Sequence, residues 1–189
     1  MEITGIILAG GKAGRMGGID KALITVKGKT IIERTVETLR DVVDDIIVVS
    51  GNDYNFKGIN VTMVRDIEKD KGPIMGIYSG LIASKTEWNF ICGCDMPYLN
   101  SSIILTLIEN IRESEAVVPV ADGRKEPLCA LYSKRLIEKL QGAIGENILK
   151  VSDFLSKVNV EYVSDDLIRK TDLEYNPFFN INYATDIRD

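Results

Sequence analysis

A glycine-rich, cationic stretch that directly follows a short apolar run constrains this chain more than any other feature. The run, Ile3 to Leu8, is rich in β-branched residues, which indicates a buried strand. The stretch after it contains several glycines and three cations: Gly10, Gly11, Lys12, Gly14, Arg15, Gly17, Gly18 and Lys21. Glycines let backbone N–H groups approach a ligand, and such groups together with cations bind anions. The stretch therefore predicts a phosphate-binding loop, the alternative being a solvated basic turn.

The common phosphate motifs do not describe this loop. A Walker loop requires Gly-x4-Gly-Lys-Ser/Thr, which no register of the stretch supplies. A dinucleotide fingerprint requires G-x-G-x-x-G at the start of a helix, and residues 15–18 do not open one. The loop therefore matches neither of these two phosphate-binding motifs.

Composition narrows the class of protein. The chain has 189 residues, the size of a single domain spanning 1–189, and a net charge of −5, which argues against nucleic acid as a partner. No run approaches the ~18 apolar residues of a membrane span, and the N-terminus lacks a secretory pattern. We therefore expect a cytoplasmic protein without a membrane partner.

The residue types that are scarce restrict the chemistry further. The chain has no histidine, which removes every histidine-dependent triad and proton relay. Its three cysteines, Cys92, Cys94 and Cys129, are too few for a structural zinc site and are expected to be buried thiols. The remaining chemistry uses carboxylates, cations and a hard metal ion.

Apolar periodicity predicts strands that alternate with helices. The expected strands cover residues 3–8, 46–50, 61–64, 88–91, 116–120, 128–132 and 160–163, and the expected helices cover 30–39, 74–84, 101–111, 134–140 and 149–158. This order indicates an α/β fold with a mostly parallel, twisted, Rossmann-like sheet between two helical layers (three-layer α/β/α). Ligands of such sheets bind beyond the carboxyl ends of the strands.

Three polar residues follow predicted strands and should therefore meet at that edge. Asp95 follows the strand at 88–91 and precedes Pro97, so a stiff turn would hold its carboxylate for Mg²⁺. Asp66 follows the strand at 61–64, and Asn52 follows the strand at 46–50. The alternative for Asp95 and Asn52 is a plain turn residue bonded to its own backbone.

Taken together, the motifs resemble a known family over nearly the whole chain. Leu8-Ala9-Gly10-Gly11 with Arg15-Met16-Gly17 and Lys21 resembles the L-A-G-G-x-x-x-R-M-G-x-x-K signature of the nucleotidyltransferases with a glycosyltransferase-A-like fold. The segments at 94–97, 66–76 and 178–182 resemble that family's C-D-x-P, D-x(n)-G-P-x-x-G and F-x-N-[IV]-N-T elements. The residues of the first loop are most similar to those of the molybdenum cofactor guanylyltransferase branch. This resemblance implies the nucleotide-diphospho-sugar transferase type of fold.

The resemblance implies a role for each matching residue. Asp95 is expected to hold Mg²⁺, and the acceptor is expected to contact Asn180 and Asn182. The implied catalytic residues are Arg15, Lys21 and Asp95. The implied nucleotide-binding residues are Leu8, Ala9, Gly10, Gly11, Lys21, Asn52, Asp66 and Asp95.

The implied reaction is transfer of GMP from Mg·GTP to the terminal phosphate of molybdopterin, releasing pyrophosphate. A phosphate nucleophile is already deprotonated at pH 7, so a chain without histidine needs no general base for it. The implied partners are GTP, molybdopterin and, transiently, other proteins of molybdenum cofactor biosynthesis. The alternatives are a cytidylyltransferase or another NTP transferase of the same fold, and a non-catalytic nucleotide-binding relative.

The sequence departs from the family pattern at three positions. Ala13 replaces a serine in the first loop, and Tyr183 replaces the threonine of the last motif. Glu126 stands before Pro127 where histidine or glutamine is more usual.

Overall fold

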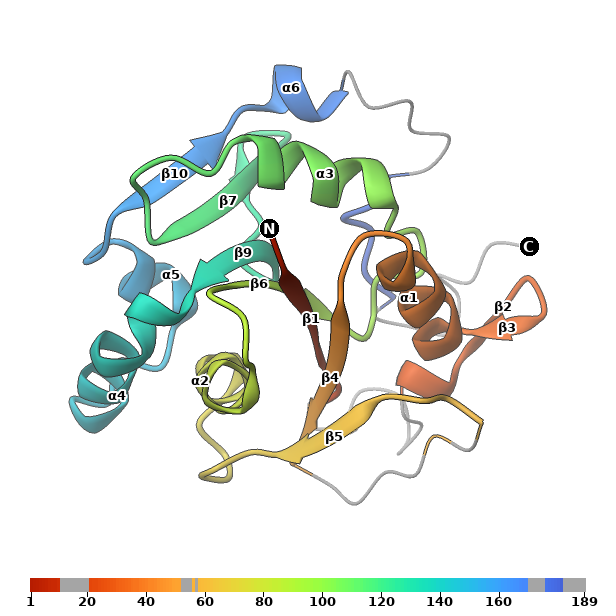
Figure 1. Ribbon diagram of the computed structural model, residues 1–189, viewed down its shortest axis with the longest axis horizontal. Coiled ribbons are helices and arrows are strands. Elements are labelled where there is room, and N and C mark those ends of the chain that lie inside the picture. The colour runs from red at the N-terminus through yellow and green to blue at the C-terminus, as the bar shows by residue number, and fades with distance from the viewer. Residues whose placement is uncertain (11–20, 52–55, 57, 170–175, 182–189) are drawn as a thin grey trace.

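The computed structural model describes residues 1–10, 21–51, 56, 58–169 and 176–181, which form an α/β fold (Figure 1). Its strands are β1 (Ile3–Leu8), β2 (Thr25–Val26), β3 (Lys29–Thr30), β4 (Asp45–Ser50), β5 (Thr62–Arg65), β6 (Trp88–Gly93), β7 (Ala116–Ala121), β8 (Arg124–Lys125), β9 (Cys129–Ser133) and β10 (Val160–Val163). Its α-helices are α1 (Ile31–Arg40), α2 (Pro73–Ala83), α3 (Ser101–Glu109), α4 (Ile137–Gly145), α5 (Val151–Leu155) and α6 (Asp165–Arg169). Two 3₁₀ turns, η2 (Lys21–Leu23) and η3 (Lys134–Leu136), complete the set. No helix in this described part is long and apolar enough to cross a bilayer.

One large sheet carries the fold. Its strands lie in the order β10-β7-β9-β6-β1-β4-β5, and β8 pairs with β7 as a short hairpin arm. The strands β6, β1, β4 and β5 are parallel, β10 is parallel to β7, and β9 runs antiparallel to both of its neighbours. The strands β1, β4, β5, β6, β7 and β10 therefore end at one edge of the sheet, called the carboxyl edge below. This confirms the predicted mostly parallel sheet.

Helices cover both faces of the sheet, as the predicted three-layer arrangement requires. Apolar residues of α1, α3 and α6 pack on one face against inward side chains of β1, β4, β6 and β9. Apolar residues of α2, α4 and α5 pack on the other face. Figure 1 shows the two groups on opposite sides of the strands. Burial on both faces explains why the central strands read as continuous apolar runs.

Local signals in the sequence place several helix ends correctly. Thr30 caps α1 through a capping box with Glu33: Thr30 Oγ1 accepts from the Glu33 N–H (3.3 Å), and the Glu33 carboxylate accepts from the Thr30 N–H (2.7 Å). Asn100 caps α3 by accepting from the Ile103 N–H at 3.1 Å. Pro73 occupies the first turn of α2, where its missing N–H has no partner to lose.

Two of the predicted helices differ from the observed elements. Residues 134–136 form a 3₁₀ turn because the Ser133 hydroxyl accepts from the Arg135 N–H, and α4 then continues to Gly145. The helix expected at 149–158 is only Val151–Leu155. The β2–β3 hairpin and α6 were not predicted.

Gly80 of α2 lies directly against the sheet, and we predict that Gly80→Ala destabilises the protein. A methyl group there would lie 2.6 Å from Ile6 Cγ2, so either the helix or the strand must shift. Overpacking of this kind costs about 1–3 kcal/mol, which urea unfolding would measure. Gly142→Ala in α4 is the control, because nothing apart from its chain neighbours and the backbone of its own helix lies within 4 Å of the added methyl. We expect the control to be neutral or to gain up to about 1 kcal/mol. Equal losses in both variants would contradict the packing argument.

Candidate active site

The ends of four parallel strands meet at the carboxyl edge, where backbone hydrogen bonds continue just beyond the strands. Ala9 N donates to Val49 O (2.8 Å), Cys94 N to Leu8 O (3.2 Å) and Asp66 N to Ser50 O (3.3 Å). These bonds hold the starts of the loops after β1, β5 and β6 against neighbouring strands. The predicted convergence of Asp66, Asp95 and the start of the glycine loop is thereby confirmed.

Asp95 and Lys21 form an ion pair at this edge. Lys21 Nζ lies 3.2 Å from Asp95 Oδ2, and each side chain keeps 29% of its surface exposed. The two residues are 74 positions apart, so only the fold brings them together. An accessible carboxylate beside an accessible ammonium group can hold a metal ion and neutralise a phosphate chain.

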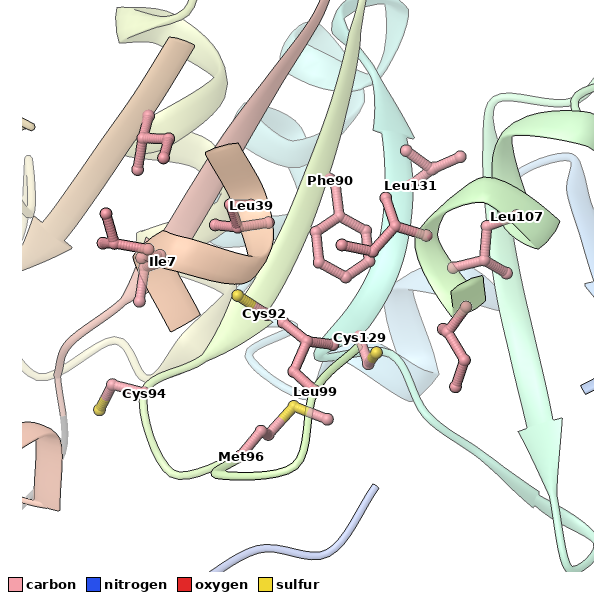
Figure 2. Close-up of a cluster of buried hydrophobic side chains, with 14 of the residues drawn as sticks. Ile7, Leu39, Phe90, Cys92, Cys94, Met96, Leu99, Leu107, Cys129 and Leu131 are labelled. Carbon is pink, nitrogen blue, oxygen red and sulfur yellow. The ribbon is translucent and has the colours of Figure 1, made fainter. Parts of the chain in front are cut away.

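The loop that carries Asp95 is anchored to the hydrophobic core. Figure 2 shows Met96 and Leu99 pointing from this loop toward Cys92 and Cys129, and all four belong to one buried cluster. Arg34 of α1 donates from Nε to Pro97 O at 3.0 Å, which fixes the same loop from the helix side. The Asp95 carboxylate is therefore presented from a rigid base.

The Asp66 carboxyl lies among three glycines. A methyl group built on Gly51 would lie 3.3 Å from Oδ2, one on Gly10 would lie 3.9 Å from Oδ2, and one on Gly76 would lie 3.7 Å from Oδ1. Oδ1 is buried and accepts no hydrogen bond from the described residues. Burial raises the pKa of Asp66. Since buried carboxylate oxygens are normally hydrogen-bonded, this one is available to a ligand donor.

The segment at 176–181 lies against the Asp95 loop. Ile181 N donates to Asp95 O at 3.0 Å, and the ring of Phe179 contacts that of Tyr98 with centroids 5.9 Å apart. Phe178 is buried in the core. Asn180, which is half-buried, is thereby placed next to the residues that flank Asp95.

The remaining predicted residues divide into two groups. Leu8 and Ala9 are buried in the core, so only their backbone can reach a ligand, whereas Gly10 is exposed at the edge. Gly11, Arg15, Asn52 and Asn182 lie outside the described residues.

The donor set favours a hard metal ion over a soft one. All three cysteines are buried, and burial raises the pKa of Cys92 and Cys129, so these two remain neutral thiols. Within the described ranges, no group of three or more His, Cys, Asp and Glu could enclose a metal ion. Mg²⁺ fits this arrangement, because it takes one or two carboxylates and completes its shell with water and substrate phosphate oxygens.

Sequence reasoning did not assign the β7–β8 hairpin to this edge. Asp122 and Gly123 have φ angles of 49° and 74°, the positive values of a two-residue hairpin turn. The Asp-Gly pair signalled the turn, but its place on the same edge as the end of β6 depends on β9 lying between β6 and β7.

Comparisons with known proteins agree with this architecture. Residues 5–160 match the family model described as MobA-like NTP transferase domain. A molybdenum cofactor guanylyltransferase from Desulfosudis oleivorans is 34% identical over 181 residues, which cover 95% of this chain and 90% of that protein. A probable molybdenum cofactor guanylyltransferase from Bacillus cytotoxicus is 37% identical over 187 residues, covering 96% of this chain and 92% of that protein.

A solved structure extends the likeness to three dimensions. The crystal structure of molybdopterin-guanine dinucleotide biosynthesis protein A from Archaeoglobus fulgidus superimposes with a TM-score of 0.82 at 26% identity, covering 97% of this chain and 94% of that one. The family predicted from the sequence motifs is therefore confirmed: this chain belongs to the MobA-like NTP transferase domain family.

Proposed function

We propose that this protein transfers GMP from Mg·GTP to the terminal phosphate of molybdopterin, forming molybdopterin guanine dinucleotide and pyrophosphate. The observation that carries the proposal is the Lys21–Asp95 pair at the carboxyl edge, one strand from Gly10, in a chain of this family. This is where an α/β sheet binds a nucleotide, and the pair supplies the charges that a metal-bound triphosphate requires.

Charge stabilisation accounts for the chemistry. Asp95 would hold Mg²⁺, which when bound neutralises the triphosphate and the departing pyrophosphate. Lys21 lies against Asp95 and would bind the same phosphates, together with Arg15. Fixed charges of this kind act where negative charge develops in the transition state. The acceptor phosphate needs no general base because it is already ionised at pH 7.

The β1–β4–β5 half of the edge suits the nucleoside. Asp66, with its buried and unpaired Oδ1 among the described residues, would accept hydrogen bonds from the nucleoside, and Gly10 and Gly51 leave room for close approach. Leu8, Ala9, Gly10 and Gly11 would contribute backbone groups, and Asn52 would contact the base. Asn180 and Asn182 would contact the pterin-bearing acceptor.

The buried thiols support a proposal for the cellular setting. Cysteine thiols that are not part of a disulfide framework are typical of a reducing compartment, and we propose that the reaction takes place in the cytoplasm. Transient contacts with other proteins of molybdenum cofactor biosynthesis would deliver the acceptor and remove the product.

The direct test combines nucleotide binding with turnover. The protein is titrated with GTP, CTP, ATP and UTP in the presence of Mg²⁺, and is then incubated with labelled GTP and molybdopterin. We expect selective GTP binding and formation of the dinucleotide with one pyrophosphate per transfer. Selective CTP binding would indicate a cytidylyltransferase. Release of pyrophosphate without an acceptor would indicate a hydrolase, and failure to bind any nucleotide would indicate a non-catalytic relative.

We predict that Asp95→Ala reduces the transfer rate by at least about 10²-fold, because the metal ion that would neutralise the leaving group loses its fixed ligand. The melting temperature should change little, since the Asp95 contact with Ile181 uses the backbone oxygen. Asp153→Ala, an exposed carboxylate on α5, is the control and should keep full activity. A full rate in Asp95→Ala would remove this residue from the metal site.

Lys21→Ala should lower kcat by about 10²–10³-fold and weaken GTP binding less, because the cation acts mainly on charge that builds during the reaction. Lys139→Ala is the matched control, since its ammonium also pairs with a carboxylate, that of Glu115 at 2.7 Å. Steady-state kinetics distinguish the two effects. An unchanged kcat in Lys21→Ala would contradict its catalytic role.

Asp66→Asn should stabilise the free protein at pH 7 and weaken nucleotide binding. The folded-state pKa of Asp66 is raised, so the ionised form is disfavoured and stability falls as pH rises from the ordinary pKa of Asp through the raised value. Asparagine removes that penalty but also removes the anionic acceptor. Thermal melts between pH 4 and pH 8 with and without Mg·GTP measure both effects. A loss of stability in the free variant would contradict this account.

A further inference from the structure

Glu126 lies at the carboxyl edge, shortly before the antiparallel strand β9. Because β9 runs opposite to β6 and β7, it begins at the edge where those strands end. Gly93 N, two residues before Asp95, donates to Leu128 O at 3.1 Å, which ties the start of β9 to the Asp95 loop. Glu126, two residues before Leu128, therefore lies on the same edge as Asp95.

Backbone bonds fix the position of Glu126. Its N–H donates to Pro119 O at 3.0 Å, and its carbonyl oxygen accepts from Cys129 N at 3.1 Å. Lys125 is held on the other side of the chain, with Nζ 3.1 Å from Tyr162 Oη and 4.2 Å from the centre of that ring. Since alternate residues of an extended segment share a face, Arg124 and Glu126 lie on the face opposite to Lys125.

The Glu126 side chain makes no hydrogen bond within the described part of the chain. It is half-buried, yet none of the described residues donates a hydrogen bond to it. Burial raises the pKa of Glu126, and the opposing effect of the nearby Arg124 is smaller. Glu126 fits a ligand that donates hydrogen bonds.

The order of strands assigns this carboxylate to one side of the site. Along the edge, Asp66 follows β5, Gly51 follows β4, Gly10 follows β1, Asp95 follows β6 and Glu126 precedes β9. In the proposed function, the nucleoside binds at the ends of β1, β4 and β5. Glu126 lies on the other side of Asp95, which is the side left for the acceptor. Neighbouring strands are about 4.8 Å apart, which puts the start of β9 within reach of a ligand whose phosphate meets Asp95.

Charge decides which part of the acceptor Glu126 can face. A carboxylate without a bound cation repels phosphate groups, which disfavours Glu126 beside the path of the acceptor phosphate or the triphosphate. The pyrimidine ring of a pterin carries an N–H and an amino group side by side, and this edge matches the two oxygens of a carboxylate. We propose, on the basis of the proposed function, that Glu126 is a specificity-determining residue that binds the amino-pyrimidine edge of the pterin acceptor.

The test measures acceptor binding separately from turnover. The dissociation constant of molybdopterin is determined by equilibrium dialysis for the full chain bound to a non-hydrolysable Mg·GTP analogue. We expect Glu126→Gln to bind molybdopterin about 10- to 100-fold more weakly, because one ring donor loses its charged acceptor. GTP affinity and its Mg²⁺ dependence should be unchanged. Glu138→Gln, an exposed carboxylate of α4, is the control.

A change in the ligand gives an independent readout. Pterin and lumazine differ at the 2-position, where lumazine carries an oxygen in place of the amino group. Pterin and lumazine are compared by their affinities as competitors of molybdopterin. Pterin should bind more tightly than lumazine to the unaltered chain and to Glu126→Asp. The Glu126→Gln variant should lose most of this preference.

Equal molybdopterin affinities in the unaltered chain and Glu126→Gln, or a retained pterin preference, would overturn this role for Glu126. A shifted Mg²⁺ dependence with unchanged acceptor affinity would instead make it a metal ligand and also overturn it. Failure of the unaltered chain to form the dinucleotide, with acceptor binding intact, would overturn the proposed function alone.

Discussion

The parallel register of β5, β4, β1 and β6 is the constraint on which the candidate site depends. Leu8 pairs with Val49 on one side and with Gly93 on the other, and Ser50 pairs with Arg65, so the four strands end at nearly the same level. Backbone hydrogen bonds continue across this level into the loops. Asp66 and Asp95 therefore leave the sheet at the level of Gly10 and Gly51, which follow the buried strands β1 and β4. Lys21 then reaches Asp95 from a 3₁₀ turn after the glycine loop.

The antiparallel strand β9 gives the edge two distinct halves. On one side lie Gly10, Gly51 and Asp66, the half that we propose for the nucleoside. On the other side lie the β7–β8 hairpin and Glu126, while the segment carrying Asn180 is bonded to the Asp95 loop through Ile181. The Lys21–Asp95 pair stands between the two halves. Two anionic substrates that must meet at one phosphorus would have their other ends separated by this arrangement.

Local interactions made several features predictable. The capping box of Thr30 and Glu33, the Asn100 cap and the Asp122-Gly123 turn each act between residues close in sequence, so their signals can be read directly. The ends of α4 and α5 were less predictable. They depend on competing backbone bonds, such as that from Ile148 N to Ala143 O, and on Asn147, whose φ of 59° ends α4. The roles of all the candidate site residues remain predictions, and Gly11, Arg15, Asn52 and Asn182 also lie outside the described residues.

The sequence by itself determined the alternation of strands and helices, the family and the residues at strand ends, because apolar periodicity and contiguous motifs are local properties of the chain. Tertiary structure alone decided that Lys21 meets Asp95 across 74 positions, that the half-buried Asp66 places its carboxyl among three glycines, and that Glu126 lies on the same edge. These contacts could not be predicted from the sequence because they depend on the order of the strands in the sheet. The position of β9 between β6 and β7 follows from long-range pairing and packing on both faces, which no nearby residues encode.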